Sequence, residues 1–263
     1  SKSVTAQEDW KEQTDGEFEL MGVVRHGTIT RFVVKREGEG EVWGRLVLTP
    51  TTARSASCFH WMNWEIEGQV KGFWMDETEV TNSQFAAFVQ ATGYVTEAEK
   101  DLSAQEFPNA PAEYLKGGSL IFKRVQGVDP FQCGTSGNLP WWKFTAAATW
   151  RTPEGPGSTI KQRMNYPVLC LTWKDVHAFA TWAGKRLPTE AEWEFAARGG
   201  LKDMPYAWGK EERPNGKYQC NHWQGTFPAN DTGVDGFKSV APVASFPPNG
   251  YGLYDISGNV WEM

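Results

Sequence analysis

The chain has 263 residues and a mass of 29.5 kDa, enough for one large domain or two small ones with a buried core. Its 26 Lys and Arg against 32 Asp and Glu give a formal charge of −6, which argues against a nucleic-acid binder. No apolar run approaches the ~20 residues of a membrane span, and 14 Trp, 27 Gly and 15 Pro favour a loop-rich domain over a helical bundle or coiled coil.

Residues 1–50 have the pattern of a β-rich segment. Strand-forming runs at 17–25, 28–35 and 42–49 are separated by turns that contain glycine, which predicts a hairpin or a meander. The segment contains no motif that carries chemistry. We therefore divide the chain into a β-rich N-terminal segment of unknown role, 1–50, and a main domain, 51–263.

The first helix of the main domain is predicted to begin near residue 82. Phe85, Phe88 and Val89 follow one another at the spacing of a single helix face. Asn82, which precedes them, is the candidate N-cap residue, because its side-chain oxygen can accept a hydrogen bond from the first helical N–H groups.

Two further helices are predicted between residues 172 and 200. One runs from about Trp173 to Ala183, is capped by Thr172 and stops at Gly184. The next begins at Thr189 with a capping-box pattern and ends at 199–200. We interpret 184–193, which mixes charged and aromatic residues, as a junction between these helices rather than as a catalytic motif.

The cysteines and histidines show no spacing typical of a metal site or a catalytic pair. Four cysteines are too few for a disulfide scaffold in a chain of this length. The residues are Cys58, Cys133, Cys170 and Cys220, with His26, His60, His177 and His222. We therefore do not expect a zinc or iron active site.

Acidic side chains near the C-terminus suggest cation sites. Asp255 and Glu262 flank Gly258, which allows a sharp turn, and Asn221 and Asp235 could bracket a second ion. Calcium prefers such mixtures of carboxylates and carbonyl oxygens. From these residues alone, a solvated acidic turn is the favoured interpretation, because an acidic pair in a glycine-rich loop is usually no more than that.

Four blocks of sequence, in matching order and spacing, resemble the formylglycine-generating enzymes, or sulfatase-modifying factors, over about 70–263. They include Gly-Phe-Trp-Met-Asp-Glu at 72–77, Pro-Trp-Trp at 140–142, Gly-Lys-Arg-Leu-Pro-Thr-Glu-Ala-Glu-Trp at 184–193 and Gly-Asn-Val-Trp-Glu at 258–262. The resemblance implies an α+β domain of the C-type-lectin-like kind, loop-rich and with little regular secondary structure.

The resemblance also implies two embedded calcium ions. The first would be held by the side chains of Asn221 and Asp235 and the carbonyls of His222 and Phe237. The second would be held by the side chains of Asp255 and Glu262 and the carbonyls of Gly258 and Val260.

The family's reaction, carried over by resemblance, oxidises a cysteine of a sulfatase to formylglycine with molecular oxygen. Trp141 and Trp261 match positions of the groove that would bind an extended, cysteine-containing peptide. Copper(I), a soft ion, is bound in the family by two cysteines separated by four residues. No two cysteines of this chain have that spacing, so copper is expected only if a further segment supplies the pair.

The lack of a cysteine pair with the family's spacing has two open interpretations. The chain can be a C-terminally incomplete piece of a longer polypeptide, or a short relative that acts as a non-catalytic C-type-lectin-like domain for a peptide, protein or glycan. In either case we expect no formylglycine-generating activity from the chain as given. Ala180 and Ala197 stand where vertebrate members have disulfide cysteines, which favours a bacterial-type protein in a reducing compartment.

Overall fold

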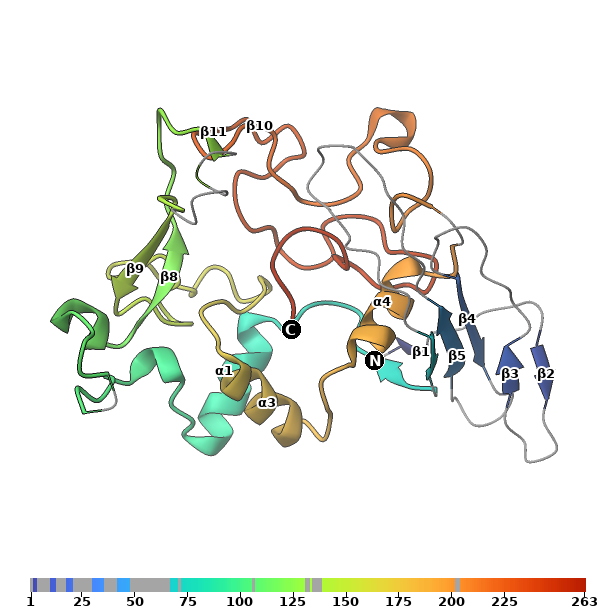
Figure 1. Cartoon of the computed structure of the whole chain (residues 1–263), viewed down its shortest axis with the longest axis horizontal. Helices are drawn as coiled ribbons and strands as arrows, with labels where there is room; N and C mark the ends of the chain where they lie inside the picture. The colour runs from blue at the N-terminus through green and yellow to red at the C-terminus, as the bar shows by residue number, and fades with distance from the viewer. Residues whose placement is uncertain are drawn as a thin grey trace. The chain divides into compact units, whose positions relative to one another are not determined.

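The computed structural model describes residues 72–263 except 106, 131, 132, 134–138, 202 and 203, and before residue 72 it describes only the backbone of six strands. The chain forms two compact units, each assembled from separate stretches. Unit 1 comprises Ser1–Thr78, Pro188–Cys220 and Phe246–Ser257; unit 2 comprises Glu79–Leu187, Asn221–Ser245 and Gly258–Met263. Figure 1 labels the elements of both.

Unit 1 contains short antiparallel strands. Strands β4 (Thr30–Lys35), β5 (Val42–Val47) and β6 (Glu67–Val70) form one sheet, in which Lys35 pairs with Val42. The remaining pairs are β2 (Trp10–Glu12) with β3 (Phe18–Leu20), and β1 (Lys2–Ser3) with β7 (Trp74–Met75). The hairpin predicted from the runs 28–35 and 42–49 is therefore confirmed. Of the run 17–25, β3 is described and the rest lies outside the described residues.

Helix α4 (Glu190–Arg198) lies against β4, β5 and β6 (Figure 1). It begins and ends as predicted. The hydroxyl of Thr189 accepts from the N–H of Glu192 at 3.2 Å, and the Glu192 carboxylate accepts from the N–H of Thr189 at 2.8 Å. On its buried face, Phe195 packs between Phe73 and Tyr251, with ring centroids 6.4 and 6.0 Å away. Capping and two aromatic contacts thus fix this helix.

The C-terminal end of α4 is pinned to the loop after residue 246. The amide of Asn249 donates to the carbonyls of Ala196 and Ala197 at 2.7 and 3.2 Å. Gly199 ends the helix with φ +56°, and a Cβ added to it would lie 2.7 Å from the backbone nitrogen of Gly250. Glycine is required here by both the left-handed conformation and the close backbone approach.

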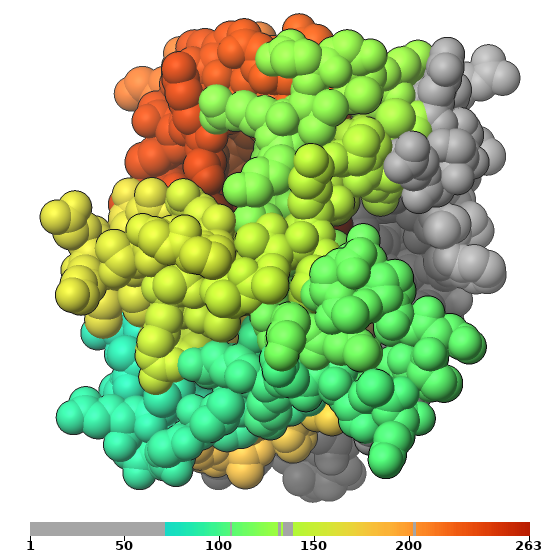
Figure 2. Space-filling model, turned by 90° about the vertical axis from the view of Figure 1, so that its left-hand side faces the viewer, coloured from blue at the N-terminus to red at the C-terminus, as the bar shows by residue number. Residues whose placement is uncertain are grey.

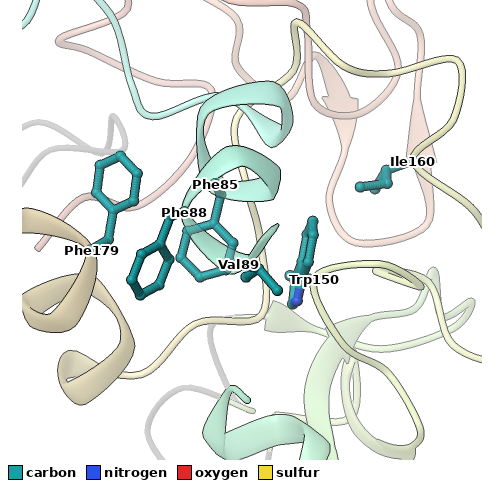
Figure 3. Packing of buried hydrophobic residues seen from close by; sticks show 6 residues of the cluster. All are labelled: Phe85, Phe88, Val89, Trp150, Ile160 and Phe179. Carbon is teal, nitrogen blue, oxygen red and sulfur yellow. The ribbon is translucent and has the colours of Figure 1, made fainter. Parts of the chain in front are cut away.

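Unit 2 is built around helices α1 (Asn82–Thr92) and α3 (Trp173–Trp182). Figure 3 shows the six side chains of its core, which are Phe85, Phe88, Val89, Trp150, Ile160 and Phe179. The ring of Phe85 lies 5.9 Å from that of Phe179 and 5.2 Å from that of Trp150, measured between centroids. Two of the six, Trp150 and Ile160, come from loops, so the loops are part of the core.

The N-cap of α1 is Thr81, not Asn82 as the sequence predicted. The Thr81 hydroxyl accepts from the N–H of Gln84 at 3.2 Å, and the Gln84 side chain accepts in return from the N–H of Thr81 at 2.8 Å. Asn82 is the first helical residue and is 3% exposed. Its amide donates instead to the carbonyl of Arg163 at 2.8 Å. Both residue types cap helices, and a distant loop decided between them.

The rest of unit 2 is mostly loop. Its strands are the antiparallel pairs β8 (Gly118–Phe122) with β9 (Trp142–Ala146) and β10 (Gly225–Thr226) with β11 (Asn230–Asp231). Short 3-10 turns occur at Glu97–Glu99 and Ala112–Leu115, and in unit 1 at Pro214–Gly216. In Figure 2 the segments from about 100 to 160, green to yellow, cover most of one face, with α1 at its lower end. The loop-rich α+β character is confirmed.

A buried carboxylate ties three of these segments together. Asp175, in the first turn of α3, is 0% exposed. Its Oδ1 accepts from the Tyr94 hydroxyl and the Glu97 N–H, both at 3.1 Å, and its Oδ2 accepts from the N–H and hydroxyl of Thr172 at 2.7 and 2.8 Å. Burial, followed by the charge and hydrogen bond of Asp175, raises the pKa of Tyr94 to about 12.

No helix among the described residues is long and apolar enough to cross a membrane.

Candidate functional site

The residues predicted to hold the first calcium ion all lie in unit 2, in the loop that contains β10 and β11. The carboxylate of Asp235 organises this loop. Its Oδ2 accepts from the N–H of His222 at 3.1 Å, and its Oδ1 accepts from the N–H of Phe237 at 2.9 Å. The side chain of Asp235 therefore contacts the backbone of both residues whose carbonyls are the predicted ligands.

A residue that the sequence analysis did not select, Gln224, contacts two of these predicted ligands. Its Nε2 donates to the carbonyl of His222 and, at 2.7 Å, to Oδ2 of Asp235. Its Oε1 accepts from the N–H of Asp235 at 3.2 Å. The His222 carbonyl and the Asp235 carboxylate thus meet around one amide nitrogen. Carbonyl and carboxylate oxygens are the ligands that calcium prefers, but here an amide donor lies between the two, and the first calcium site stays a prediction.

Asn221, the fourth predicted ligand, is 7% exposed and held by a second amide. Its Nδ2 donates to the carbonyl of Ser239 at 2.7 Å and to Oδ1 of Asn259 at 2.9 Å. The N–H of Asn259 donates back to the carbonyl of Asn221 at 2.9 Å. Asn259 also donates to the Glu79 carboxylate and accepts from the N–H of Ala241. With its amide nitrogen engaged, Asn221 presents its oxygen as an acceptor.

A second carboxylate in the same loop, Asp231, was also missed. It is 4% exposed, and its Oδ1 accepts from the N–H groups of Gln224 and Gly233 at 3.3 and 3.0 Å. An acidic residue two positions before a glycine is an ordinary turn signal, and that signal could have selected Asp231. Nothing local distinguishes Gln224 or Asn259. The partners of Gln224 lie in its own loop, up to 11 positions away, and those of Asn259 reach as far as Glu79, 180 positions away.

The residues of the second predicted calcium site fall in both units. Asp255 belongs to unit 1, where it is 7% exposed, has φ +52° and lines a cavity of about 20 Å³. Gly258, Val260 and Glu262 belong to unit 2, and Gly258 has φ +84°, as the predicted turn requires. This second site stays a prediction. Among the residues that the structure describes, no three side chains of His, Cys, Asp or Glu gather as metal ligands.

The two tryptophans assigned to a peptide groove differ in exposure. Trp261 is 89% exposed, whereas Trp141 is 6% exposed and packs edge to face on Phe227, with centroids 5.0 Å apart. Trp141, which the resemblance assigns to the groove, is therefore buried in this structure. Trp142, the first residue of β9, has its ring 5.7 Å from that of Trp261. Trp142 is half-buried, and Trp141, which precedes β9, is the buried one of the two neighbours.

The spacing of this chain's cysteines differs from that of the family's copper-binding pair. Cys133, Cys170 and Cys220 carry thiols rather than disulfides, and Cys58 lies outside the described residues. Burial raises the pKa of Cys170, against a smaller lowering by a hydrogen bond with Ser119. No two of the four are separated by four residues. The residues present therefore do not fit the copper(I) pair expected from the resemblance.

The chain matches the family described as sulfatase-modifying factor enzyme 1-like domains over residues 19–263, and it belongs to that family. The match begins within the β-rich segment 1–50. The family assignment made from the four sequence blocks is therefore confirmed, together with its loop-rich α+β domain.

Individual relatives include catalytic and inactive proteins. The chain is 51% identical over 191 residues to the formylglycine-generating enzyme of Thermomonospora curvata, covering 72% of this chain and 58% of that protein. It is 49% identical over 193 residues to that of Mus musculus, covering 73% and 48%. It is 45% identical over 197 residues to the "Inactive C-alpha-formylglycine-generating enzyme 2" of Bos taurus, covering 74% and 60%. The chain thus spans about half the length of these curated relatives.

One solved structure is similar at low identity. The structure of PvdO from Pseudomonas aeruginosa has 18% sequence identity and a TM-score of 0.42, and the alignment covers 89% of this chain and 72% of that one.

Proposed function

We propose that this chain is the peptide-binding and calcium-holding part of a formylglycine-generating domain, which acts on an extended, cysteine-containing peptide of a sulfatase-like protein. The family and the named relatives support the reaction class. The observation that carries the proposal is the aromatic pair of Trp261, which is 89% exposed, and the half-buried Trp142, whose ring lies 5.7 Å from that of Trp261.

The aromatic pair has the properties of a peptide-binding surface. Indole rings provide a large contact area at low conformational-entropy cost, and Trp is enriched among residues that dominate binding energies. Beneath the pair, Phe122 packs against Trp142 at 5.9 Å and against Trp223 at 5.5 Å. These contacts hold the ring of Trp142 in place, so that a bound peptide need not order it.

The oxidation itself would require copper(I), which activates oxygen when two cysteines of the family bind it. This chain lacks a pair with that spacing, so its own residues are assigned to binding and positioning. In the proposal, Trp142 and Trp261 hold the target peptide, and the loop around Asp235 provides a fixed frame.

Calcium would be held first by Asn221, His222, Asp235 and Phe237. The ion would join the ends of the loop that contains β10 and β11 through its contacts with these oxygens, because the sequence of this loop has little apolar periodicity. A ligand that binds only the folded state stabilises it by about 2.7 kcal/mol at 100 times its dissociation constant.

Chelation should therefore lower the melting temperature of the wild type, and Asp235→Ala or Asp255→Ala should remove much of that difference. Glu190→Ala, at the start of α4, should leave it unchanged. An unchanged wild-type melting temperature in chelator would refute the calcium assignment.

The peptide site is tested by titrating a Cys-x-Pro-x-Arg peptide into the chain and following binding by calorimetry. Trp261→Ala and Trp142→Ala should each weaken binding at least tenfold. Trp173→Ala is the matched control, since Trp173 is also exposed, at 58%, but lies on α3. Equal losses for Trp173→Ala and Trp261→Ala, or no binding by the wild type, would contradict the assignment.

A second candidate is a non-catalytic binding domain for a peptide, protein or glycan. The absence of a cysteine pair with the required spacing favours it, and inactive relatives have similar identity. Incubation of the chain with the same peptide, oxygen and copper, followed by mass spectrometry, separates catalysis from binding. We expect no conversion by this chain alone. A mass loss corresponding to formylglycine would show that the chain is a complete catalyst.

A further inference from the structure

Strands β8 and β9 of unit 2 form a sheet of two strands, which Figure 1 shows side by side. The N–H of Lys123, just after β8, donates to the carbonyl of Trp141, just before β9, at 2.7 Å. Hydrogen-bonded and non-hydrogen-bonded pairs alternate along an antiparallel ladder, so Leu120 and Phe144, which face each other, form a non-hydrogen-bonded pair. The backbone N–H and C=O groups of Phe144, and those of Ala146 two residues further on, therefore point away from β8.

These outward groups of β9 are open to a partner. Within the part of the chain that the structure describes, no hydrogen bond reaches the outward N–H and C=O groups of Phe144 and Ala146. The N–H of Trp142 is engaged, since it donates to the carbonyl of Leu139 at 3.0 Å. Lys143 and Ala146 are exposed, and Phe144 is half-buried. The outer edge of β9 thus presents alternating donors and acceptors, which is a template for pairing with an extended chain.

The outer edge of β8 is flanked by other segments at both of its ends. A Cβ added to Gly117, just before β8, would lie 2.8 Å from the carbonyl oxygen of Ala98. Beyond the other end, the N–H of Val125 donates to the carbonyl of Pro228 at 3.4 Å. A further strand therefore fits on β9 rather than on β8.

The aromatic pair of the proposed function continues along β9. Trp142, whose ring contacts that of Trp261, is the first residue of the strand. Phe144 lies two residues further on, and its ring centroid is 5.3 Å from that of Tyr114, which is 48% exposed. Alternate residues of a strand share a face, so a chain paired with β9 would lie beside these rings.

We propose that the target peptide binds by adding to the outer edge of β9 as a further strand. This inference rests on the peptide site of the proposed function and states how that site holds the backbone of the peptide. In strand addition, main-chain hydrogen bonds supply affinity, and contacts with alternate side chains supply specificity. The partner must offer alternating N–H and C=O groups at the strand spacing, which an extended peptide does and a glycan does not.

The proline of a Cys-x-Pro-x-Arg peptide then decides the register. Proline has no N–H and is tolerated in a strand only where its nitrogen faces away from the neighbouring strand. Backbone groups two residues apart point to the same side of an extended chain. The Cys and Arg backbone groups therefore also face away from β9, and the two x residues form the hydrogen bonds.

N-methylation of single peptide residues tests this register by calorimetry with the wild-type chain. A methyl group on the nitrogen of either x residue removes a donor and blocks the approach to β9, so binding should weaken at least tenfold. The same methyl group on the Arg nitrogen is the matched control and should leave affinity within threefold of the unmodified peptide. An equal loss for the Arg and x peptides, or no loss for the x peptides, would overturn the inference.

Two proline variants of the chain identify the edge. Ala146→Pro removes an outward N–H of β9 and leaves the ladder with β8 in place. It should weaken binding of the unmodified peptide about fivefold, the effect of one lost hydrogen bond. Leu120→Pro makes the same change on the outer edge of β8 and should leave affinity within twofold of the wild type. The reverse order of these effects would contradict addition to β9, and circular dichroism checks that both variants fold.

A second copy of this chain is the other partner that an open edge can pair with. Light scattering of the chain without peptide separates the two. If the wild type forms a dimer that Ala146→Pro abolishes, while peptide binding is unchanged, the edge serves self-association and the inference is wrong.

The outcomes also separate strand addition from the peptide site itself. If the wild type does not bind the unmodified peptide, the proposed peptide site is wrong and strand addition falls with it. If the peptide binds and Trp261→Ala weakens binding, but N-methylation of the x residues has no effect, the peptide site is supported and strand addition is wrong.

Discussion

Replacing Asp175 by Asn should destabilise the core of unit 2 more than any change to an exposed carboxylate. The side chain is fully buried and accepts four hydrogen bonds, two on each oxygen, from Tyr94, Glu97 and Thr172. Asn keeps the shape but replaces one oxygen by an amide NH₂ group. That group would face two donors, so two of the four hydrogen bonds are lost wherever the amide points.

The expected loss follows from these contacts. Hydrogen bonds to a charged group contribute about 1.5–3 kcal/mol each, so two of them amount to about 3–6 kcal/mol. The neutral amide needs less solvation than a carboxylate, which offsets part of this loss. We therefore expect Asp175→Asn to lower the free energy of unfolding by about 3–4 kcal/mol, a fall in melting temperature of about 10 °C for a chain of this size.

Urea unfolding at pH 7, followed by tryptophan fluorescence, measures the difference. The control is Asp101→Asn. Asp101 also accepts from a backbone N–H, that of Gly117, and pairs with Lys116 at 2.8 Å, but its side chain is 61% exposed. Exposed ion pairs contribute less than about 1 kcal/mol. Equal losses for the two variants, or a loss under about 1 kcal/mol for Asp175→Asn, would refute this account of the buried carboxylate.

Two more predictions concern Tyr94 and the helix-ending glycines. Because the folded pKa of Tyr94, about 12, lies above the ordinary 10, its neutral form is favoured by the fold. This stabilisation is complete below pH 10 and is lost as pH rises toward 12. Tyr94→Phe should therefore remove this loss of stability at alkaline pH when the free energy of unfolding is measured against pH. Gly93 and Gly199 both end helices in the left-handed conformation, but a Cβ meets nothing within 4 Å at Gly93 and lies 2.7 Å from a backbone nitrogen at Gly199. In chemical denaturation, Gly93→Ala should lower the free energy of unfolding by about 1 kcal/mol and Gly199→Ala by about 2–4 kcal/mol. Equal losses for the two variants would contradict the close approach of Gly199 to the Gly250 backbone.

Local signals predicted the helices and their ends. Thr172, Thr189 and Gly199 occupy the cap positions expected from sequence, because capping requires only residues within one turn of each other. The exception is Thr81, which caps α1 in place of Asn82. Either side chain could cap α1, and the choice depended on the carbonyl of Arg163, 81 positions away.

The residues of the candidate site also divide into those that the sequence indicated and those that only the structure revealed. Its carboxylates and glycine turns were visible in the sequence, since Asp235, Asp255 and Gly258 are the residue types that cation sites and sharp turns require. The amides that hold them, Gln224 and Asn259, were not, and neither was the choice of Trp142 over Trp141 as the neighbour of Trp261. Residue types and short spacings set the possible ligands and caps. Which side chain is buried, saturated or exposed is decided by chain segments that meet only when the protein folds.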